Sequence, residues 1–254
     1  MRRPKRTFNR GTMSVPIVAF LLTLFLPLAV EAQNVTLDFG TGGEATGRIV
    51  QIIALLTILT LAPSILVMVT SFVRIVIVLS LLRTALGTQG TPPNTVVISL
   101  ALFMTFFIMQ PTLDAAYQNG IAPLIAEQIT EAQALDRSVG PVRTFMLSHV
   151  REKDLDLFLT MAKIETLETP EETPLQALIP AFMISELRRA FEIGFLLFVP
   201  FLIIDMVVAS VLMSMGMMML PPVMISLPFK LIFFVLVDGW YLVAGSLVES
   251  FNSG

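Results

Sequence analysis

The chain has 254 residues, of which 55% are hydrophobic and only 14% are charged, and its formal net charge is −3. Soluble globular proteins carry about 25% charged residues, so this composition indicates an integral membrane protein that folds with the bilayer as solvent. The chain contains no cysteine, which excludes disulfides, thiolate catalysis and cysteine-based metal sites. Its acidic balance gives no support to the binding of nucleic acid.

The N-terminus is predicted to be a bacterial secretory signal peptide. Five of the 16 basic residues lie in Met1–Arg10, and the apolar stretch Val15–Val30 follows them. That stretch is shorter than the roughly 20 residues that a spanning helix needs. Val30 and Ala32 supply the small residues of a cleavage site, so we expect the mature chain to begin at Gln33. An uncleaved membrane anchor is the alternative interpretation.

Four apolar runs are predicted to form the helices of the mature protein. These runs are Ile49–Leu82, Thr95–Met109, Leu178–Leu212 and Val223–Val248. At about 1.5 Å per residue, the longest runs exceed the roughly 30 Å of hydrocarbon in a bilayer. Pro63 and Pro200 lie near the middles of the first and third runs. Because proline interrupts helices, we expect either kinked, tilted helices or hairpins that are buried against other subunits.

The polar block between the second and third runs is predicted to be helical and extracytoplasmic. Residues 112–176 carry eleven acidic and five basic residues, and apolar side chains recur there at the spacing of a helix face. Basic residues in short loops favour the cytoplasmic side, and Arg83 and Lys230 lie beside the two turns that join the runs. The acidic block is therefore placed on the opposite side. The apolar repeats are Leu155, Phe158, Leu159 and Ala162, and Val142, Phe145, Met146 and His149.

These features predict an all-α integral membrane protein with four long, Pro-broken helical segments, paired as hairpins, and a small acidic helical block between the second and third. In chain order, the predicted parts are a signal peptide at 1–32, an irregular extracytoplasmic lead at 33–48, a first hydrophobic hairpin at 49–111, an extracytoplasmic helical block at 112–176, and a second hydrophobic hairpin with a methionine-rich loop at 177–254.

The sequence predicts a protein that is not an enzyme and has no metal site or cofactor. It has no glycine-rich phosphate loop, no His-Glu-x-x-His and no Gly-x-Ser-x-Gly. Its single histidine, His149, ends an apolar helix face, and this position favours a packing role over a catalytic one.

Charged residues inside the apolar runs are costly in lipid and usually face a partner or an aqueous path. Helical spacing and the hairpin connection predict ion pairs between helices or subunits. An alternative is a proton- or ion-coupled secondary transporter with Asp205, Glu192 and Asp238 as carriers. The predicted pairs are Glu186 with Arg189, Arg188 with Glu192, and Asp205 with Lys230, and Arg74 is a further charge in the first run.

A methionine-rich segment joins the third and fourth runs. Met213–Leu220 holds five methionines and Gly216, and Pro221 and Pro222 follow. Glycine and proline disfavour a continuous helix here. Thioether side chains are flexible and polarizable, so the segment suits a seal that re-packs when something passes, whereas ordinary packing at a membrane helix end is the alternative.

Several ordered motifs resemble the FliP family of flagellar export-gate proteins. They cover most of the chain from about residue 50 onward. The related virulence-secretion family, SctR, shares the general pattern, and the signal peptide and the methionine run favour the flagellar branch. The motifs are Ser71–Ser80, Leu82–Gln89 with Thr91–Asn94, Phe106–Pro111, Pro180–Gly194, and Phe201 through the methionine run to Lys230.

The resemblance implies a core subunit of the flagellar type III secretion export gate, in the basal body at the bacterial inner membrane, with its N-terminus translocated after signal cleavage. Such proteins assemble in several copies, pentamer-like, with FliQ and FliR into a channel for unfolded flagellar proteins, beside FlhB and FlhA. The family's methionine gasket maps onto Met217, Met218 and Met219, with Met213, Met215 and Gly216 as neighbours. A structural scaffold without a conduit is a further alternative.

Overall fold

The computed structural model describes residues 43–88, 90–164, 169–217 and 219–252, and every regular element in them is a helix. The predicted all-α class is therefore confirmed. The predicted signal peptide and its cleavage site at Ala32 and Gln33 lie outside the described residues. The chain divides into two compact units, 1–55 and 56–254. Helix α2 (Gly43–Met68) crosses that division, so residues 43–48, which we predicted to be irregular, are helical.

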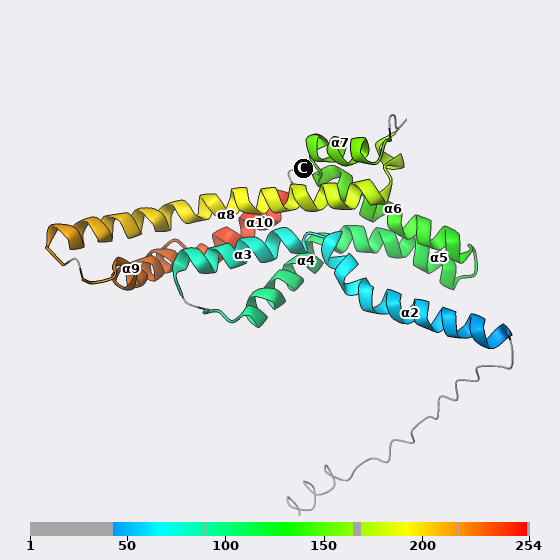
Figure 1. The fold of residues 1–254 in the computed structure, drawn as a ribbon, viewed down its shortest axis with the longest axis horizontal. Helices are drawn as coiled ribbons and strands as arrows, with labels where there is room; N and C mark the ends of the chain where they lie inside the picture. The colour runs from blue at the N-terminus through cyan, green and yellow to red at the C-terminus, as the bar shows by residue number, and fades with distance from the viewer. Residues whose placement is uncertain (1–42, 89, 165–168, 218, 253–254) are drawn as a thin grey trace, which may run out of the picture. The chain divides into compact units, whose positions relative to one another are not determined.

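The second unit contains the remaining helices, which are drawn from cyan to red in Figure 1. Helix α8 runs beside α3 and α9, and it extends furthest. The elements are α3 (Phe72–Leu86), α4 (Asn94–Ala116), the π-helical turn η1 (Tyr117–Ile121), α5 (Ala122–Ile125), α6 (Glu131–His149), α7 (Glu152–Met161), the 3-10 turn η2 (Pro170–Glu172), α8 (Leu175–Ser214), α9 (Pro222–Leu236) and α10 (Gly239–Asn252).

The prediction that Pro63 and Pro200 break their runs is wrong. Pro63 lies inside α2, and α8 is one continuous helix of 40 residues with Pro200 inside it. A proline removes one backbone hydrogen bond, and long apolar helices absorb that loss through local adjustment and neighbouring contacts. The real breaks lie elsewhere. The first run is interrupted after Met68, where the Thr70 hydroxyl accepts a hydrogen bond from the N–H of Phe72 (3.4 Å).

The fourth run is also interrupted, at the bend between α9 and α10. The two helices are bent by 64° relative to each other, and Asp238 takes a left-handed φ of 51° in the bend. By length and composition, three described helices can cross a membrane, or four if this bent pair is one span. At about 1.5 Å per residue, α8 is about 60 Å long, which is twice the hydrocarbon thickness. It cannot cross a bilayer upright without protruding.

The hydrophobic core of the second unit is built around α3. Ile75, Val78 and Leu82 of α3 are fully buried and belong to one cluster with side chains of α4, α8, α9 and α10. Helices α3 and α8 approach closely: a Cβ atom at Gly194 would lie 2.2 Å from Cδ1 of Leu81. Glycine at this position therefore permits the close contact between the two helices.

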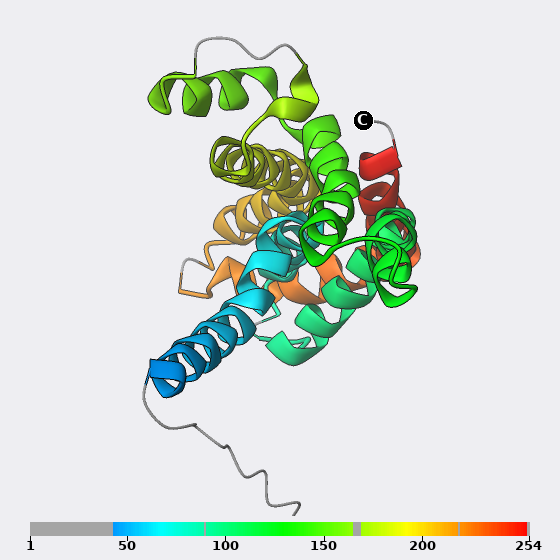
Figure 2. The ribbon, with the colours of Figure 1, turned by 90° about the vertical axis from the view of Figure 1, so that its right-hand side faces the viewer.

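Two helices of the polar block, α6 and α7, pack on the N-terminal half of α8. Figure 2 shows α6 beside α8, and α7 lying across α8. Met146 of α6 forms a buried cluster with Leu178 and Phe182 of α8. A capping box starts α6, in which Thr130 and Gln133 bond each other's backbone. The predicted boundary at residue 111 falls inside α4, which continues to Ala116.

Candidate functional site

The methionine-rich segment forms a closed helix end that is followed by a turn. The N–H of Met217 donates to the carbonyl of Leu212 (3.0 Å), and the N–H of Gly216 donates to that of Met213 (3.1 Å). Gly216 has a φ of +73°. These bonds form a Schellman motif, in which a left-handed residue, usually glycine, terminates a helix and satisfies its last carbonyls. Glycine is required at position 216 by this left-handed backbone conformation and not by a contact with a neighbouring side chain.

The described methionine side chains of the segment are exposed. The exposed fraction reaches 98% at Met219 and is 42% at Met217. Met213 and Met215 are exposed as well, and Met218 lies outside the described residues. Contiguous exposed apolar side chains mark a surface that binds lipid or another chain. The turn therefore presents flexible thioethers outward from the end of α8.

A charged junction joins the two helices that flank this segment. Nζ of Lys230, on α9, lies 2.6 Å from Oδ2 of Asp205 on α8 and 3.1 Å from the carbonyl of Ala85 on α3. The Ser226 hydroxyl donates to Oδ1 of Asp205 (2.5 Å). Ala85 lies in the last turn of α3, where carbonyls lack helical partners and a cation is favourable. The predicted pair of Asp205 and Lys230 is present, and it joins three helices.

The carboxylate of Glu186, on α8, has a different partner from the one that the sequence predicts. Glu186 does not pair with Arg189. Its carboxylate forms a two-pronged ion pair with the guanidinium of Arg74 on α3, and Nε of Arg74 lies 2.8 Å from Oε2. The side chains of Arg74 and Glu186 are 3% and 0% exposed. Glu186 pairs across helices because both charges are buried, and an isolated buried charge is very costly.

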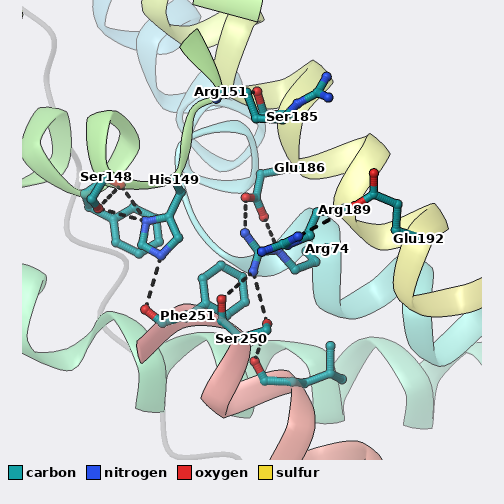
Figure 3. A network of polar contacts seen from close by, with 12 residues as sticks. Arg74, Ser148, His149, Arg151, Ser185, Glu186, Arg189, Glu192, Ser250 and Phe251 are labelled. Atoms are coloured by element: carbon teal, nitrogen blue, oxygen red, sulfur yellow. Dashed lines mark hydrogen bonds and ion pairs between the residues drawn. The ribbon is translucent and has the colours of Figure 1, made fainter. Parts of the chain in front are cut away.

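Arg74 is held on its other side by α10 (Figure 3). Its Nη1 donates to the carbonyl and to the hydroxyl of Ser250, at 3.0 Å each. The guanidinium carbon lies 3.6 Å from the centroid of the Phe251 ring, which adds a cation–π contact. Arg74 thereby joins α3, α8 and α10.

Arg188, Arg189 and Glu192 form a separate, exposed group on α8. Nε of Arg188 lies 2.8 Å from Oε1 of Glu192, as helical spacing predicted. Nη1 of Arg189 lies 3.6 Å from Oε2 of the same carboxylate. All three side chains are about half exposed, so these pairs contribute little to stability.

A third network docks α7 on α8. The Ser185 hydroxyl donates to Oδ2 of Asp154 (2.6 Å) and accepts from the N–H of Arg151 (3.1 Å). The Arg151 guanidinium bonds both oxygens of Asp154. Burial disfavours the charged form of Asp154, but the hydrogen bonds from Ser185 and Arg151 outweigh this effect and hold the pKa of Asp154 below its ordinary value.

His149 lies in a packing position, as its place on the apolar face of α6 predicted. Its ring lies 4.6 Å from that of Phe145 and 5.3 Å from that of Phe251, between centroids. Nε2 lies 3.2 Å from the carbonyl of Phe251, and Nδ1 lies 2.9 Å from the Ser148 hydroxyl. Among the described residues, no group of three or more histidine, aspartate or glutamate side chains could hold a metal ion.

Sequence reasoning missed the partners of two buried charges. Arg74 is a charge in an apolar run, which signals that it needs a buried partner, but its partner lies 112 positions away. Asp154 and Ser185 carry no sequence signal that distinguishes them. The three carboxylates that could act as carriers in a transporter have different surroundings. Glu192 and Asp205 are paired with cations, and Asp238 lies exposed in the bend between α9 and α10.

A family model and several known proteins match most of the chain. The model of the FliP family matches residues 55–247. The Flagellar biosynthetic protein FliP of Caulobacter vibrioides is 60% identical over 246 residues, which cover 96% of this chain and 92% of that protein. The protein of the same name from Bacillus subtilis is 55% identical over 208 residues (82% and 94%), and that from Pectobacterium carotovorum is 53% identical over 233 residues (91% and 90%).

Proposed function

The chain belongs to the FliP family of flagellar biosynthetic proteins, and on that premise we propose that it is a core subunit of the flagellar type III export gate. In this role several copies, pentamer-like, assemble with FliQ and FliR around a channel for unfolded flagellar proteins, next to FlhB and FlhA. The proposed role requires no chemical step. The observation that carries it is the exposed methionine turn at the end of α8.

The methionine turn suits a pore gasket for a physical reason. Met217 and Met219 are exposed on a turn whose backbone is closed by Gly216, so copies arranged in a ring can direct thioethers toward one axis. Methionine has three rotatable bonds and no strong directional bonding. A ring of such side chains yields to a polypeptide, while a hydrophobic constriction resists wetting and blocks ions. We assign the gasket to Met217, Met218 and Met219.

The proposed assembly also explains the uncovered apolar surface. On α8, Leu196 and Val207 are 68% and 57% exposed, and on α4 Phe103 is 75% exposed. Such surfaces need lipid or a neighbouring subunit. A 40-residue α8, longer than the bilayer is thick, is compatible with helices stacked around a channel as well as with tilted spans.

The gasket is tested by shortening its three methionines to alanine together. The change should leave assembly intact, because the described side chains of this set, Met217 and Met219, are exposed, while the constriction widens and becomes wet. Ion leakage across membranes that contain the assembled complex should rise, and export should be retained or only partly reduced. Leakage is measured with reconstituted vesicles, and assembly by purification with the neighbouring subunits.

A matched control changes exposed methionines elsewhere. Met68, Met161 and Met206 are 41%, 70% and 65% exposed, and their joint change to alanine should leave leakage at the level of the parent. A gasket variant that assembles fully and stays as tight as the parent would show that the methionine run is ordinary packing at a helix end.

The proposed location is the bacterial inner membrane, in the flagellar basal body, with the N-terminus translocated after cleavage of the signal peptide. Cleavage after Ala32 is tested by mass spectrometry of protein extracted from membranes. The mature, assembled chain should begin at Gln33. Recovery of residues 1–32 on that chain would replace the signal peptide with an uncleaved anchor.

A further inference from the structure

A polar cavity of about 150 Å³ opens beside the N-terminal half of α8. Arginine side chains from three segments surround it, and a space of this size holds several water-sized groups, since one water needs about 10–15 Å³ on the same measure. Figure 3 shows most of these side chains around Glu186. The charged and aromatic lining residues are Arg74, Arg151, Arg188, Arg189, Glu192 and His149.

The charges of the lining side chains and of the carboxylates bonded to them do not balance. The four lining arginines face three carboxylates: Glu192 in the lining, and Glu186 and Asp154, which pair with Arg74 and Arg151. One positive charge remains in this group. Because each of the three carboxylates is already bonded to an arginine, the remaining charge calls for an anion from outside the group.

Several N–H groups of the lining arginines have no hydrogen-bond acceptor among the described residues. A guanidinium carries five N–H donors. Within the described residues, Arg188 uses only its Nε, toward Glu192, and Arg151 uses Nε and Nη2 toward Asp154 but not Nη1. Nη1 of Arg189 lies 3.6 Å from Oε2 of Glu192, which is an ion pair and too long for a hydrogen bond. Planar guanidinium groups with free donors match the oxygens of a phosphate.

The surface next to the cavity is apolar and exposed. Phe191 and Phe195 follow Arg188 by three and seven positions, so the three residues share one face of α8. The side chains of Phe191 and Phe195 are 59% and 69% exposed. Cationic side chains that border an exposed apolar helix face match the boundary between the headgroups and the acyl chains of a lipid layer.

We propose that this cavity binds a phosphate group, and that the headgroup of an anionic phospholipid supplies it. Arg151, Arg188 and Arg189 bond the phosphate oxygens, and one phosphodiester charge neutralises the excess positive charge. The acyl chains lie along Phe191 and Phe195. Arg74, whose bonds go to Glu186 and Ser250, holds the floor of the cavity and does not bond the phosphate.

Native mass spectrometry of the full chain, extracted with its neighbouring subunits in detergent, tests this site by titration with phosphatidylglycerol or phosphatidylcholine. The parent should retain phosphatidylglycerol in preference to phosphatidylcholine. The double change Arg188→Gln with Arg189→Gln should weaken phosphatidylglycerol binding about tenfold or more, because charge-assisted hydrogen bonds are lost. Both side chains are more than half exposed, so the variant should melt as the parent does.

A matched control, Arg137→Gln with Lys153→Gln, removes two exposed basic residues outside the cavity and should leave lipid binding unchanged. Equal losses in both variants would mean general surface charge and would overturn the site, as would unchanged binding in the Arg188 and Arg189 variant. A cross-link from position 188 to an acidic residue of a second copy, without any lipid effect, would overturn it in favour of a carboxylate partner.

A second experiment distinguishes binding of a lipid headgroup from binding of free phosphate. Phenylglyoxal modifies accessible guanidinium groups, and phosphatidylglycerol in detergent should protect Arg188 and Arg189 from it. Inorganic phosphate alone should protect them much less. Equal protection by inorganic phosphate would retain the phosphate site and overturn its assignment to a lipid.

Discussion

At the scale of single residues, burial separates two kinds of ion pair on the same helix. Arg74 and Glu186 are almost fully buried, whereas Arg188 and Glu192 are 57% and 47% exposed. Breaking a buried pair leaves an uncompensated charge away from water, while exposed pairs are screened by solvent. The pair whose loss should destabilise the fold therefore joins α3 to α8, and the pair within α8 remains available for contacts outside the chain.

Glu186→Ala should destabilise the protein by about 3–5 kcal/mol, because it leaves Arg74 buried and unpaired. Thermal or denaturant unfolding in detergent, followed by helical circular dichroism, measures the change. Glu192→Ala is the matched control on the same helix, and it should cost less than about 1 kcal/mol. Similar losses in the two variants would contradict the assignment of the buried pair.

The carboxylate of Asp154 should make stability depend on pH. Its folded pKa is lowered, so its ionised form contributes stability above the pKa of the unfolded chain, about 3.9. That contribution disappears as the pH falls through the lower folded pKa. Asp154→Asn should therefore unfold more easily than the parent at neutral pH, and the difference should shrink as the pH falls below about 4.

Asp156→Asn provides the control for this prediction, because Asp156 is exposed on the same helix. It should follow the parent across the whole pH range. A difference between Asp154→Asn and the parent that stays constant down to strongly acidic pH would show that the carboxylate is not the titrating group.

At the scale of elements, helix ends decide the shape of this chain more than prolines do. Helix α8 passes through Pro200 without a break and ends at a Schellman motif built on Gly216. Helix α9 then begins at Pro222, where a proline has no hydrogen bond to lose. The exposed methionine turn exists because these two end signals are only a few residues apart.

Gly216→Ala should destabilise the end of α8 by about 1 kcal/mol, because alanine disfavours the left-handed φ of this residue. Open space surrounds the position, so the cost comes from the backbone alone. Gly245→Ala is the control: a Cβ atom at Gly245 would also meet no other part of the chain within 4 Å, but this residue lies inside α10. That change should stabilise the protein by about 0.5–1 kcal/mol.

Unfolding in detergent compares the two glycine variants. The expected result is a difference in sign, with Gly216→Ala less stable and Gly245→Ala more stable than the parent. If both changes stabilise the protein, the left-handed helix end is not present in solution.

At the scale of the whole molecule, apolar side chains are divided between a buried core and a surface that needs a cover. On α4, Met104 is 9% exposed, while Phe103 and Phe107 are 75% and 66% exposed. The same helix thus serves the fold with one face and an outside partner or lipid with the other. The proposed assembly predicts that these two faces respond differently to mutation.

Phe103→Ser together with Phe107→Ser should leave the unfolding transition of the isolated chain near that of the parent, because neither ring is in the core. The amount of chain recovered with its neighbouring subunits should fall several-fold, since contact area is lost. Met104→Ser is the opposite control and should destabilise the chain itself by about 2–5 kcal/mol. Unchanged recovery of the Phe103 and Phe107 variant would mean that lipid alone covers this face.

The sequence by itself determined the class of the protein and the positions of most helices. Helices depend on local hydrogen bonds and on the spacing of apolar side chains, which can be read along the chain. For the same reason the pair of Arg188 with Glu192, four positions apart, was predictable. Asp205 and Lys230 were predictable as a pair because they flank one short connection.

Only the tertiary structure decided the partner of Glu186 and the places where the runs break. Arg74 lies 112 positions from Glu186, and nothing local distinguishes it from Arg189, which is only three positions away. Glu186 pairs with Arg74 because both side chains are buried. The free-energy cost of removing two charges from water is offset only when they form a close, bidentate contact. Likewise, Pro63 and Pro200 have the local chemistry of a helix breaker, yet α2 and α8 continue through them and the runs break at other places.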